Sequence, residues 1–302
     1  MKLDESLFKI DAAVYVDRLC DFVRERCSAL HREGILVPFS GGLDSTTVLL
    51  LCARAVGIER VTALLMPEIQ GNPAARRYAR LVTKQFKIKT ITRNISFILA
   101  SLGTYHFILS LIPVRSIQDW VGRSYWKASG TNPFLQFVYG RSDRLQRRAT
   151  ARINTKQRIR TVVEYLVAEE MNYLVAGSAH KSEDLVGLYV KFGVDDNADI
   201  MPLKNLYRSH TLQLAAYLGA PEAILGRSPN PDIIPGVTDK YLDILGLPSN
   251  KMDLLLYGIE HGMDETEIAD QLALPVGKVR EIWDLVQQTE HMRNPSQSLT
   301  WK

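Results

Sequence analysis

The segment Ser-Gly-Gly-Leu-Asp-Ser at residues 40–45 stands between an apolar run, 35–39, and a helical pattern of apolar residues, 46–56. The order strand, loop, helix places such a loop at the carboxyl end of a strand, where α/β proteins bind their ligands. Its glycines let backbone amides approach oxygen atoms closely, and the helix that follows adds partial positive charge. We therefore predict a phosphate-binding loop made by Ser40, Gly41, Gly42, Leu43, Asp44 and Ser45.

The alternation of strand and helix patterns continues beyond this loop and predicts an α/β fold with a doubly wound parallel sheet. The expected strands cover 35–39, 61–66, 89–95 and 173–176, and the expected helices cover 4–33, 46–56, 74–86 and 159–169. The aromatic stretch 104–150 interrupts the alternation, and we interpret it as an insertion or lid. A helical pattern begins at residue 248, so we divide the chain into a main domain, 1–247, and its helical extension, 248–302.

Composition limits the surroundings and partners of the chain. Its 302 residues include 37 basic and 33 acidic side chains, and the net charge of +4 suits an anionic ligand but is too small to indicate a nucleic-acid coat. The cysteines Cys20, Cys27 and Cys52 form no CxxC pair, which argues against disulfides and structural zinc. The amino-terminal segment has no uninterrupted apolar run of the kind that a signal peptide or membrane anchor contains. We expect a cytoplasmic protein.

An aspartate inside the glycine loop distinguishes it from the Walker type of loop, which ends in Gly-Lys-Ser or Gly-Lys-Thr. Neither tripeptide occurs in this chain. A carboxylate among phosphates requires a divalent cation between them. We interpret Asp44 as a magnesium ligand in a loop that grips pyrophosphate as a unit, and this favours cleavage of ATP to an adenylate and pyrophosphate.

With this loop and several segments further along the chain, the sequence resembles the ammonia-dependent NAD synthetases. These belong to the adenine nucleotide alpha-hydrolase group with a pyrophosphatase loop and have a Rossmann-like fold. The likeness covers residues 1 to about 100 and 151–295. It rests on Asn-Thr-Lys-Gln-Arg-Ile-Arg at 154–160, Gly-Ser-Ala-His-Lys-Ser-Glu at 177–183, Lys-Phe-Gly at 191–193, Asp-Ile-Met-Pro-Leu at 199–203 and Thr-Glu-His at 289–291.

The resemblance implies an ATP and magnesium site. Asp44 and Glu183 bind the magnesium ion and are catalytic, since two carboxylates and phosphate oxygens satisfy such a hard cation. The ATP phosphates lie on the loop at 40–45. Arg208 replaces a lysine that contacts the phosphates, and two residues replace threonines near the nucleotide: Ser178 and Asn230.

The resemblance also implies an acceptor site for deamido-NAD and a homodimer. The acceptor is a dinucleotide whose pyrophosphate needs cations and whose ribose hydroxyls need acceptors. His291 is expected near the two-fold interface, and Lys191 is expected to be catalytic as well as substrate-binding. The residues at matching positions are Arg158, Lys191, Asp199 and His291.

Departures from the family pattern gather on the acceptor side. The family loop Lys-Tyr-Gly-Asp-Gly-Gly becomes one residue longer at 191–197 and loses two glycines. In the stretch Pro-Gly-Gln-Thr-Asp-Glu, Val237 and Lys240 replace the glutamine and the glutamate, and Met292 replaces a lysine after the tail histidine. A carboxylate acceptor other than deamido-NAD therefore stays open.

The implied reaction begins with attack of the acceptor carboxylate on the α phosphorus of ATP, while loop amides, Lys191 and Arg208 stabilise the pyrophosphate. Ammonia then attacks the acyl adenylate. The loop begins 39 residues from the first residue given, and we expect no glutaminase segment before it, so free ammonia or a partner supplies the nitrogen.

Three rival readings follow from parts of the pattern. A tRNA-modifying thiolase shares the phosphate loop and suits the basic run at 141–160, but it usually needs sulfur-handling cysteines. A DNA reader suits the carboxyl-terminal helices, yet seven acidic residues against two basic ones at 264–290 would repel phosphate. A nucleotide sensor without activity suits the altered acceptor side, but Asp44 and Glu183 argue for retained magnesium chemistry.

Overall fold

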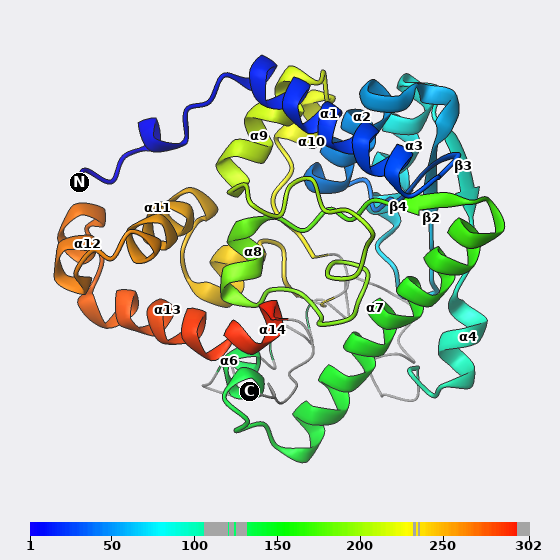
Figure 1. The fold of residues 1–302 in the computed structure, drawn as a ribbon. Coiled ribbons are helices and arrows are strands. Elements are labelled where there is room, and N and C mark those ends of the chain that lie inside the picture. Colours follow the sequence, from blue (N-terminus) through cyan, green and yellow to red (C-terminus); the bar gives the residue numbers. More distant parts are fainter. Residues whose placement is uncertain (106–119, 121–123, 125–131, 232–233, 235, 295–302) are drawn as a thin grey trace, which may run out of the picture.

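The computed structural model describes residues 1–105, 120, 124, 132–231, 234 and 236–294, shown as ribbon in Figure 1. Within this part of the chain, four parallel strands form one sheet in the order β3-β2-β1-β4. Leu36 pairs with Thr62 on one side and with Val175 on the other. The strands are β1 (Gly34–Pro38), β2 (Val61–Leu65), β3 (Lys89–Thr92) and β4 (Tyr173–Val175).

Helices connect and cover these strands. None in the described ranges is both long and apolar enough to cross a membrane. In chain order they are η1 (Glu5–Phe8), α1 (Ala12–Ala29), α2 (Leu43–Val56), η2 (Ile58–Arg60), α3 (Pro73–Gln85), α4 (Ser96–Ser101), α6 (Pro133–Val138), α7 (Arg144–Glu170), α8 (Lys181–Val186), α9 (Arg208–Tyr217), α10 (Glu222–Leu225), the π-helical turn η4 (Lys240–Ile244), α11 (Ser249–Glu260), α12 (Glu265–Leu272), α13 (Val276–Gln288) and α14 (Glu290–Arg293).

Successive residues of β1 point to opposite faces of the sheet and are buried against different helices. Ile35 and Val37 belong to an apolar cluster that includes residues of α1 and α2. Leu36 belongs to a second cluster with Val167 of α7. Helices therefore cover both faces of the sheet (Figure 1), which confirms the predicted doubly wound α/β class.

The amino-terminal helix is shorter than expected. The pattern at 4–33 predicts one helix, whereas the structure has the turn η1, an extended link and then α1. The carboxylate of Asp11 explains the interruption, because it accepts hydrogen bonds from the backbone amides of Ala13 (3.1 Å) and Val14 (3.2 Å). An aspartate in this position starts a new helix rather than continuing an old one.

Helix α7 begins 15 residues before the expected start at 159. Asp143 and Gln146 form a capping box, in which each side chain accepts a hydrogen bond from the other's backbone amide (2.8 and 3.0 Å). Residues 144–150, assigned from the sequence to the insertion, are thus the first turns of α7. The aromatic residues Tyr125 and Trp126 of the expected insertion lie outside the described residues, and its role as a lid stays a prediction.

A separate apolar cluster holds the carboxyl-terminal helices together and joins them to the amino terminus. Phe8 of η1 and Tyr241 of η4 are buried in it with Leu255 of α11 and Ile282 of α13. The cluster spans residue 247, and the division of the chain at this residue stays a prediction. Figure 1 shows α11, α12 and α13 as a group beside the sheet layer.

A buried carboxylate connects this helical group to the edge of the sheet. Asp253 of α11 is fully buried and accepts hydrogen bonds from the Ser182 hydroxyl (2.5 Å) and from the amide (2.8 Å) and hydroxyl (2.6 Å) of Ser209. The Ser182 hydroxyl oxygen in turn accepts from the backbone amide of Arg208 (3.0 Å). Asp253 therefore fixes the first turns of both α8 and α9.

Replacing Asp253 with alanine should lower the free energy of unfolding by about 3 kcal/mol, because hydrogen bonds to a charged group contribute about 1.5–3 kcal/mol and buried donors lose their acceptor. Urea unfolding followed by circular dichroism measures this. Asp270→Ala, on the exposed surface of α12, should change it by less than about 0.5 kcal/mol. Equal unfolding midpoints for the two variants would contradict the role of Asp253.

Candidate functional site

The glycine loop joins β1 to α2 at the carboxyl edge of the sheet. Gly41 has a positive φ of 74°, and a Cβ atom there would lie 2.5 Å from the backbone nitrogen of Ala79, so only glycine fits this close approach to α3. Helix α2 begins at Leu43, earlier than the expected residue 46, which places Asp44 and Ser45 in its first turn. The side chains of Asp44 and Ser45 and the positive end of the α2 dipole therefore lie together, where an anionic ligand would bind.

A cavity of about 770 Å³ opens in front of this edge. Its wall is formed by the glycine loop, the segment after β2, the middle of α7, the segments after β4 and the loop 227–231. The cavity brings together most of the residues singled out from the sequence, and those on its wall are Ser40, Gly42, Leu43, Asp44, Ser45, Arg158, Ser178, Glu183, Lys191, Arg208, Asn230 and His291.

Two of the singled-out residues are absent from this wall. The carbonyl oxygen of Gly41 accepts a hydrogen bond from Arg227 Nη1 (3.0 Å), so its contribution is to the loop's shape. Asp199 accepts hydrogen bonds from the backbone amide of Val175 (2.8 Å) and the hydroxyl of Tyr165 (3.3 Å), which ties it to the end of β4 and to α7. Its contact with a substrate stays a prediction.

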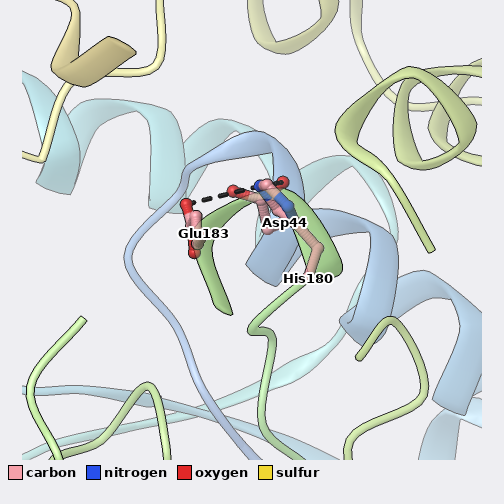
Figure 2. Close-up of side chains that lie close together, drawn as sticks. All are labelled: Asp44, His180 and Glu183. Carbon is pink, nitrogen blue, oxygen red and sulfur yellow. Dashed lines mark ion pairs between the residues drawn. The ribbon is translucent and has the colours of Figure 1, made fainter. Parts of the chain in front are cut away.

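Two carboxylates and an imidazole converge at the innermost part of the loop (Figure 2). Because β1 and β4 are neighbours, α2 and α8, which follow them, bring Asp44 and Glu183 close together. His180 Nε2 lies 3.8 Å from Asp44 Oδ1 and 3.4 Å from Glu183 Oε1. One ligand atom from each of the three residues lies within 4.8 Å of the others.

The basic side chains of Arg208 and Lys240 border this cluster. Arg208 Nη1, at the start of α9, lies 3.5 Å from Asp44 Oδ1. The Lys240 ammonium, at the start of η4, contacts Glu183 Oε1 directly. Sequence reasoning noted Lys240 only as a replacement on the acceptor side, since nothing local in the sequence shows that η4 folds back onto α8.

The charges decide which of these groups are ionised. Burial opposes ionisation of Asp44, but the neighbouring basic side chains of His180, Arg208 and Lys240 outweigh it and lower the pKa of Asp44. Burial lowers the pKa of His180 to about 4, so its ring is neutral at pH 7. Burial also lowers the pKa of Lys240, against the opposing effect of the Asp44 carboxylate.

The donor set fits a divalent cation. Asp44 Oδ1 is buried and accepts no hydrogen bond from the described part of the chain, which leaves a lone pair available to a ligand. Carboxylate oxygens are the ligands that magnesium prefers, and a triphosphate bound to the loop would supply more oxygens. Asp44 and Glu183 are the residues here that could hold such an ion.

The predicted acceptor residues also lie together. Lys191 Nζ donates hydrogen bonds to the carbonyl oxygens of His291 (2.5 Å) and Asn294 (3.1 Å), which anchors the loop 191–197 to α14. Arg158 of α7 donates to the Lys191 carbonyl through Nε (3.4 Å) and Nη2 (3.3 Å). Arg158, Lys191 and His291, far apart in the sequence, thus form one end of the cavity.

A buried ion cluster on the cavity wall was missed by sequence reasoning. Glu68, after β2, lies 3.0 Å from Lys156 Nζ and 3.6 Å from Arg160 Nη2, and it accepts a hydrogen bond from the Tyr105 hydroxyl (2.9 Å). Lys156 and Arg160 belong to the basic run at 141–160, whose spacing of four residues on α7 could have indicated a shared face. These two members of the run therefore face the cavity wall.

A parallel doubly wound sheet, a glycine loop at its carboxyl edge and a pair of carboxylates beside the loop define an α/β nucleotide-binding protein whose loop carries aspartate in place of the Walker lysine. The sequence model of the family described as NAD synthase matches residues 15–107 and 129–296. The chain belongs to this family. The match confirms the resemblance found from the sequence.

Individual relatives agree. The chain is 32% identical to the NH(3)-dependent NAD(+) synthetase of Coprothermobacter proteolyticus over 87% of this chain and 92% of the relative. Its fold is similar to NMN synthetase from Francisella tularensis (TM-score 0.70, 20% identity, 97% and 100% of the two chains). It is also similar to the NH3-dependent NAD synthetase of Campylobacter jejuni subsp. jejuni NCTC 11168, solved in complex with the nitrate ion (TM-score 0.67, 23% identity, 97% and 100%). At these identities the two structures support the fold.

Helix α7 carries a buried acidic residue that is not part of the cavity wall. Glu164 of α7 is fully buried, and its carboxylate oxygens accept no hydrogen bond from the described residues. Burial, together with the charges of Asp195 and Asp199, raises its pKa from 4.5 to about 10. Asp195 lies on the cavity wall and accepts a hydrogen bond from Gln157 Nε2 (2.8 Å). Glu164 is therefore protonated in the folded protein at neutral pH.

Glu164 should make stability depend on pH. Because its pKa is raised on folding, its contribution is complete below about pH 4.5 and is lost as the pH rises toward 10, at about 1.4 kcal/mol per pH unit. The Glu164→Gln variant has no group that titrates at this position. The difference in free energy of unfolding, variant minus wild type, should therefore increase by about 2–3 kcal/mol between pH 6 and pH 8. Glu169→Gln, exposed on the same helix, should show no such growth, and parallel curves for Glu164→Gln and the wild type would refute the assignment.

Proposed function

We propose that the chain is an ammonia-dependent ligase that uses ATP to adenylate the carboxylate of deamido-NAD and amidates it to NAD, with release of AMP and pyrophosphate. The family match and the names of the relatives support this reaction. The observation that carries it is the convergence of Asp44 and Glu183 beside the glycine loop, on the wall of a cavity of about 770 Å³. This is the arrangement needed to hold a triphosphate next to an acceptor.

ATP is proposed to bind through the loop. Backbone amides of residues 40–45 face the phosphates with the hydroxyls of Ser40 and Ser45, whose oxygens lie 3.1 Å apart. Arg208 is close enough to Asp44 to neutralise phosphate oxygens at the same point. Ser178 and Asn230, from separate loops of the cavity wall, are the proposed contacts for the rest of the nucleotide.

Magnesium is the proposed cofactor, held by Asp44 and Glu183. When bound, it would neutralise the phosphate oxygens as the pyrophosphate leaves. The chain's own groups would hold the triphosphate in line for attack: the loop amides and Arg208 on the phosphates, and Arg158 and Lys191 on the acceptor. The new bond joins an acceptor carboxylate oxygen to the α phosphorus, and the bond from the α phosphorus to the pyrophosphate oxygen breaks.

Ammonia is proposed to displace AMP from the acyl adenylate. Ammonia must be unprotonated to attack the acyl carbon, and burial among apolar groups lowers the pKa of an amine. The cavity wall includes apolar side chains that provide such surroundings, among them Met66, Phe134, Ile153, Leu188 and Ile244. We assign no protein side chain as the general base for this step.

The proposed assembly is a homodimer formed through α4 and α7. Phe97 of α4 is 84% exposed, and Val162 and Leu166 of α7 are 64% and 55% exposed, although these two helices pack against each other. Tyr165, which donates to Asp199, lies on the same face of α7 as Val162 and Leu166, because residues three and four apart share a face. Dimerisation through this face would place Asp199 at the interface. Asp199 could then contact a substrate bound to the partner subunit, although it does not lie on the cavity wall of its own subunit.

Catalysis should fail when Asp44 loses its charge. With ATP, magnesium, ammonium and deamido-NAD, the wild type should form NAD, AMP and pyrophosphate in equal amounts, measured by mass spectrometry. Asp44→Asn should lower kcat/KM by about 10²-fold or more, because the cation and the phosphates lose a shared ligand. Asp17→Asn, exposed on α1, should retain activity.

Two outcomes would overturn the proposed function. One is pyrophosphate release by Asp44→Asn at the wild-type rate. The other is failure of the wild type to amidate deamido-NAD while it amidates nicotinic acid mononucleotide, which carries the same carboxylate without the adenylate half. The second outcome would keep the ligase chemistry and replace the acceptor.

A charge on the exposed apolar face should separate the protomers. Val162→Asp places a carboxylate in the proposed interface, where burying it unpaired costs several kcal/mol. Analytical ultracentrifugation should show a dimer for the wild type and a monomer for this variant. Val14→Asp, on a half-exposed position of α1, should stay dimeric. A monomeric wild type, or a dimeric Val162→Asp variant, would refute this interface.

A further inference from the structure

We propose that the Lys240 ammonium neutralises the Asp44 and Glu183 carboxylates in the nucleotide-free protein and thereby prevents a divalent metal ion from binding to them. When a nucleotide binds, its phosphate oxygens become new partners for Lys240, and the two carboxylates are then free to hold the metal ion. The proposal rests on the proposed metal role of these two carboxylates. It makes Lys240 a positioning residue of the site.

The position of Lys240 carries the proposal. Its ammonium contacts Glu183 Oε1, the same oxygen that lies 3.4 Å from His180 Nε2. The Lys240 side chain is only 14% exposed, and that of Glu183 is 8% exposed, so water screens their attraction weakly. An ion that binds Glu183 Oε1 must displace this ammonium.

The charge balance leads to the same conclusion. Asp44 and Glu183 carry two negative charges, and Arg208 and Lys240 carry two positive charges beside them. A divalent ion entering this neutral group would leave two uncompensated positive charges in a poorly hydrated place, which is costly. A triphosphate brings the negative charge that compensates them.

The backbone around Lys240 connects it to the proposed nucleotide pocket. The Lys240 amide donates a hydrogen bond to the carbonyl of Pro229 (3.0 Å), next to Asn230. Both Lys240 and Asn230 lie on the cavity wall with the glycine loop. Lys240 also begins a π-helical turn, a local geometry that is rare and often found at functional sites. The ammonium can therefore exchange Glu183 for a phosphate oxygen within one cavity.

Metal binding without nucleotide tests the proposal directly. Manganese binding to the nucleotide-free protein is measured by the loss of the free Mn²⁺ signal in electron paramagnetic resonance, for the wild type, Lys240→Gln and Lys240→Arg. Lys240→Gln should bind Mn²⁺ at least about 10-fold more tightly than the wild type, because a neighbouring like charge is removed. Lys240→Arg keeps the charge and should bind as weakly as the wild type.

Matched controls keep the result specific. Lys278→Gln removes an ammonium paired with Glu281 (2.9 Å) on α13 and should leave Mn²⁺ binding unchanged. Lys240→Met, which keeps much of the stem's volume, gives the same comparison if the glutamine variant does not fold. A Lys240→Gln variant with the wild-type dissociation constant would overturn the proposal.

A second measurement, with nucleotide present, distinguishes failure of the proposed function from failure of the proposed role of Lys240. With the nonhydrolysable analogue α,β-methylene ATP present, the wild type should hold Mn²⁺ in a ternary complex that Asp44→Asn does not form. If this complex forms but Lys240→Gln gains nothing without nucleotide, the metal site stands and the role of Lys240 is refuted. If no variant holds Mn²⁺ in either state, both the metal assignment and the proposal about Lys240 are overturned.

Discussion

The structure depends on the adjacency of β1 and the edge strand β4 in the parallel order β3-β2-β1-β4. All carboxyl ends of a parallel sheet meet at one edge, so the segments after these two strands must meet there as well. Asp44 and Glu183 are 139 residues apart in the sequence, yet their helices start side by side at this edge. A triphosphate site with two acidic ligands follows from this topology more than from any single motif.

Holding two carboxylates together costs free energy, and the surrounding structure compensates for that cost. Arg208 and Lys240 provide opposite charges, and Asp253 fixes the start of α8 and α9 through Ser182 and Ser209. The helical group α11–α13 thus holds α8 and α9 in position through Asp253, although it lies outside the glycine loop. Phe8, near the amino terminus, is buried in the same apolar cluster as residues of these helices, so segments from both ends of the chain pack together.

The fold class and the loop could be predicted because local patterns determine them: apolar runs give the strands, and Gly41 is required by a positive φ and close contact with α3. The early start of α7 was missed because its capping box, Asp143 and Gln146, precedes a run of arginines that masks the helical pattern. The buried acid Glu164 and the ion cluster at Glu68 could not be predicted, since burial of a charge is decided by packing between distant segments. Lys240 is the clearest example, because its partner lies 57 residues earlier in the chain.

The central claim, that Asp44 and Glu183 jointly hold a divalent cation on the triphosphate, is tested most directly by a crystal structure with α,β-methylene ATP and Mn²⁺, in which the metal is located by its anomalous scattering. The account predicts one anomalous peak about 2.0–2.3 Å from a carboxylate oxygen of each residue, with the phosphates on residues 40–45. A peak bound by neither carboxylate, or a triphosphate bound away from the glycine loop, would contradict it.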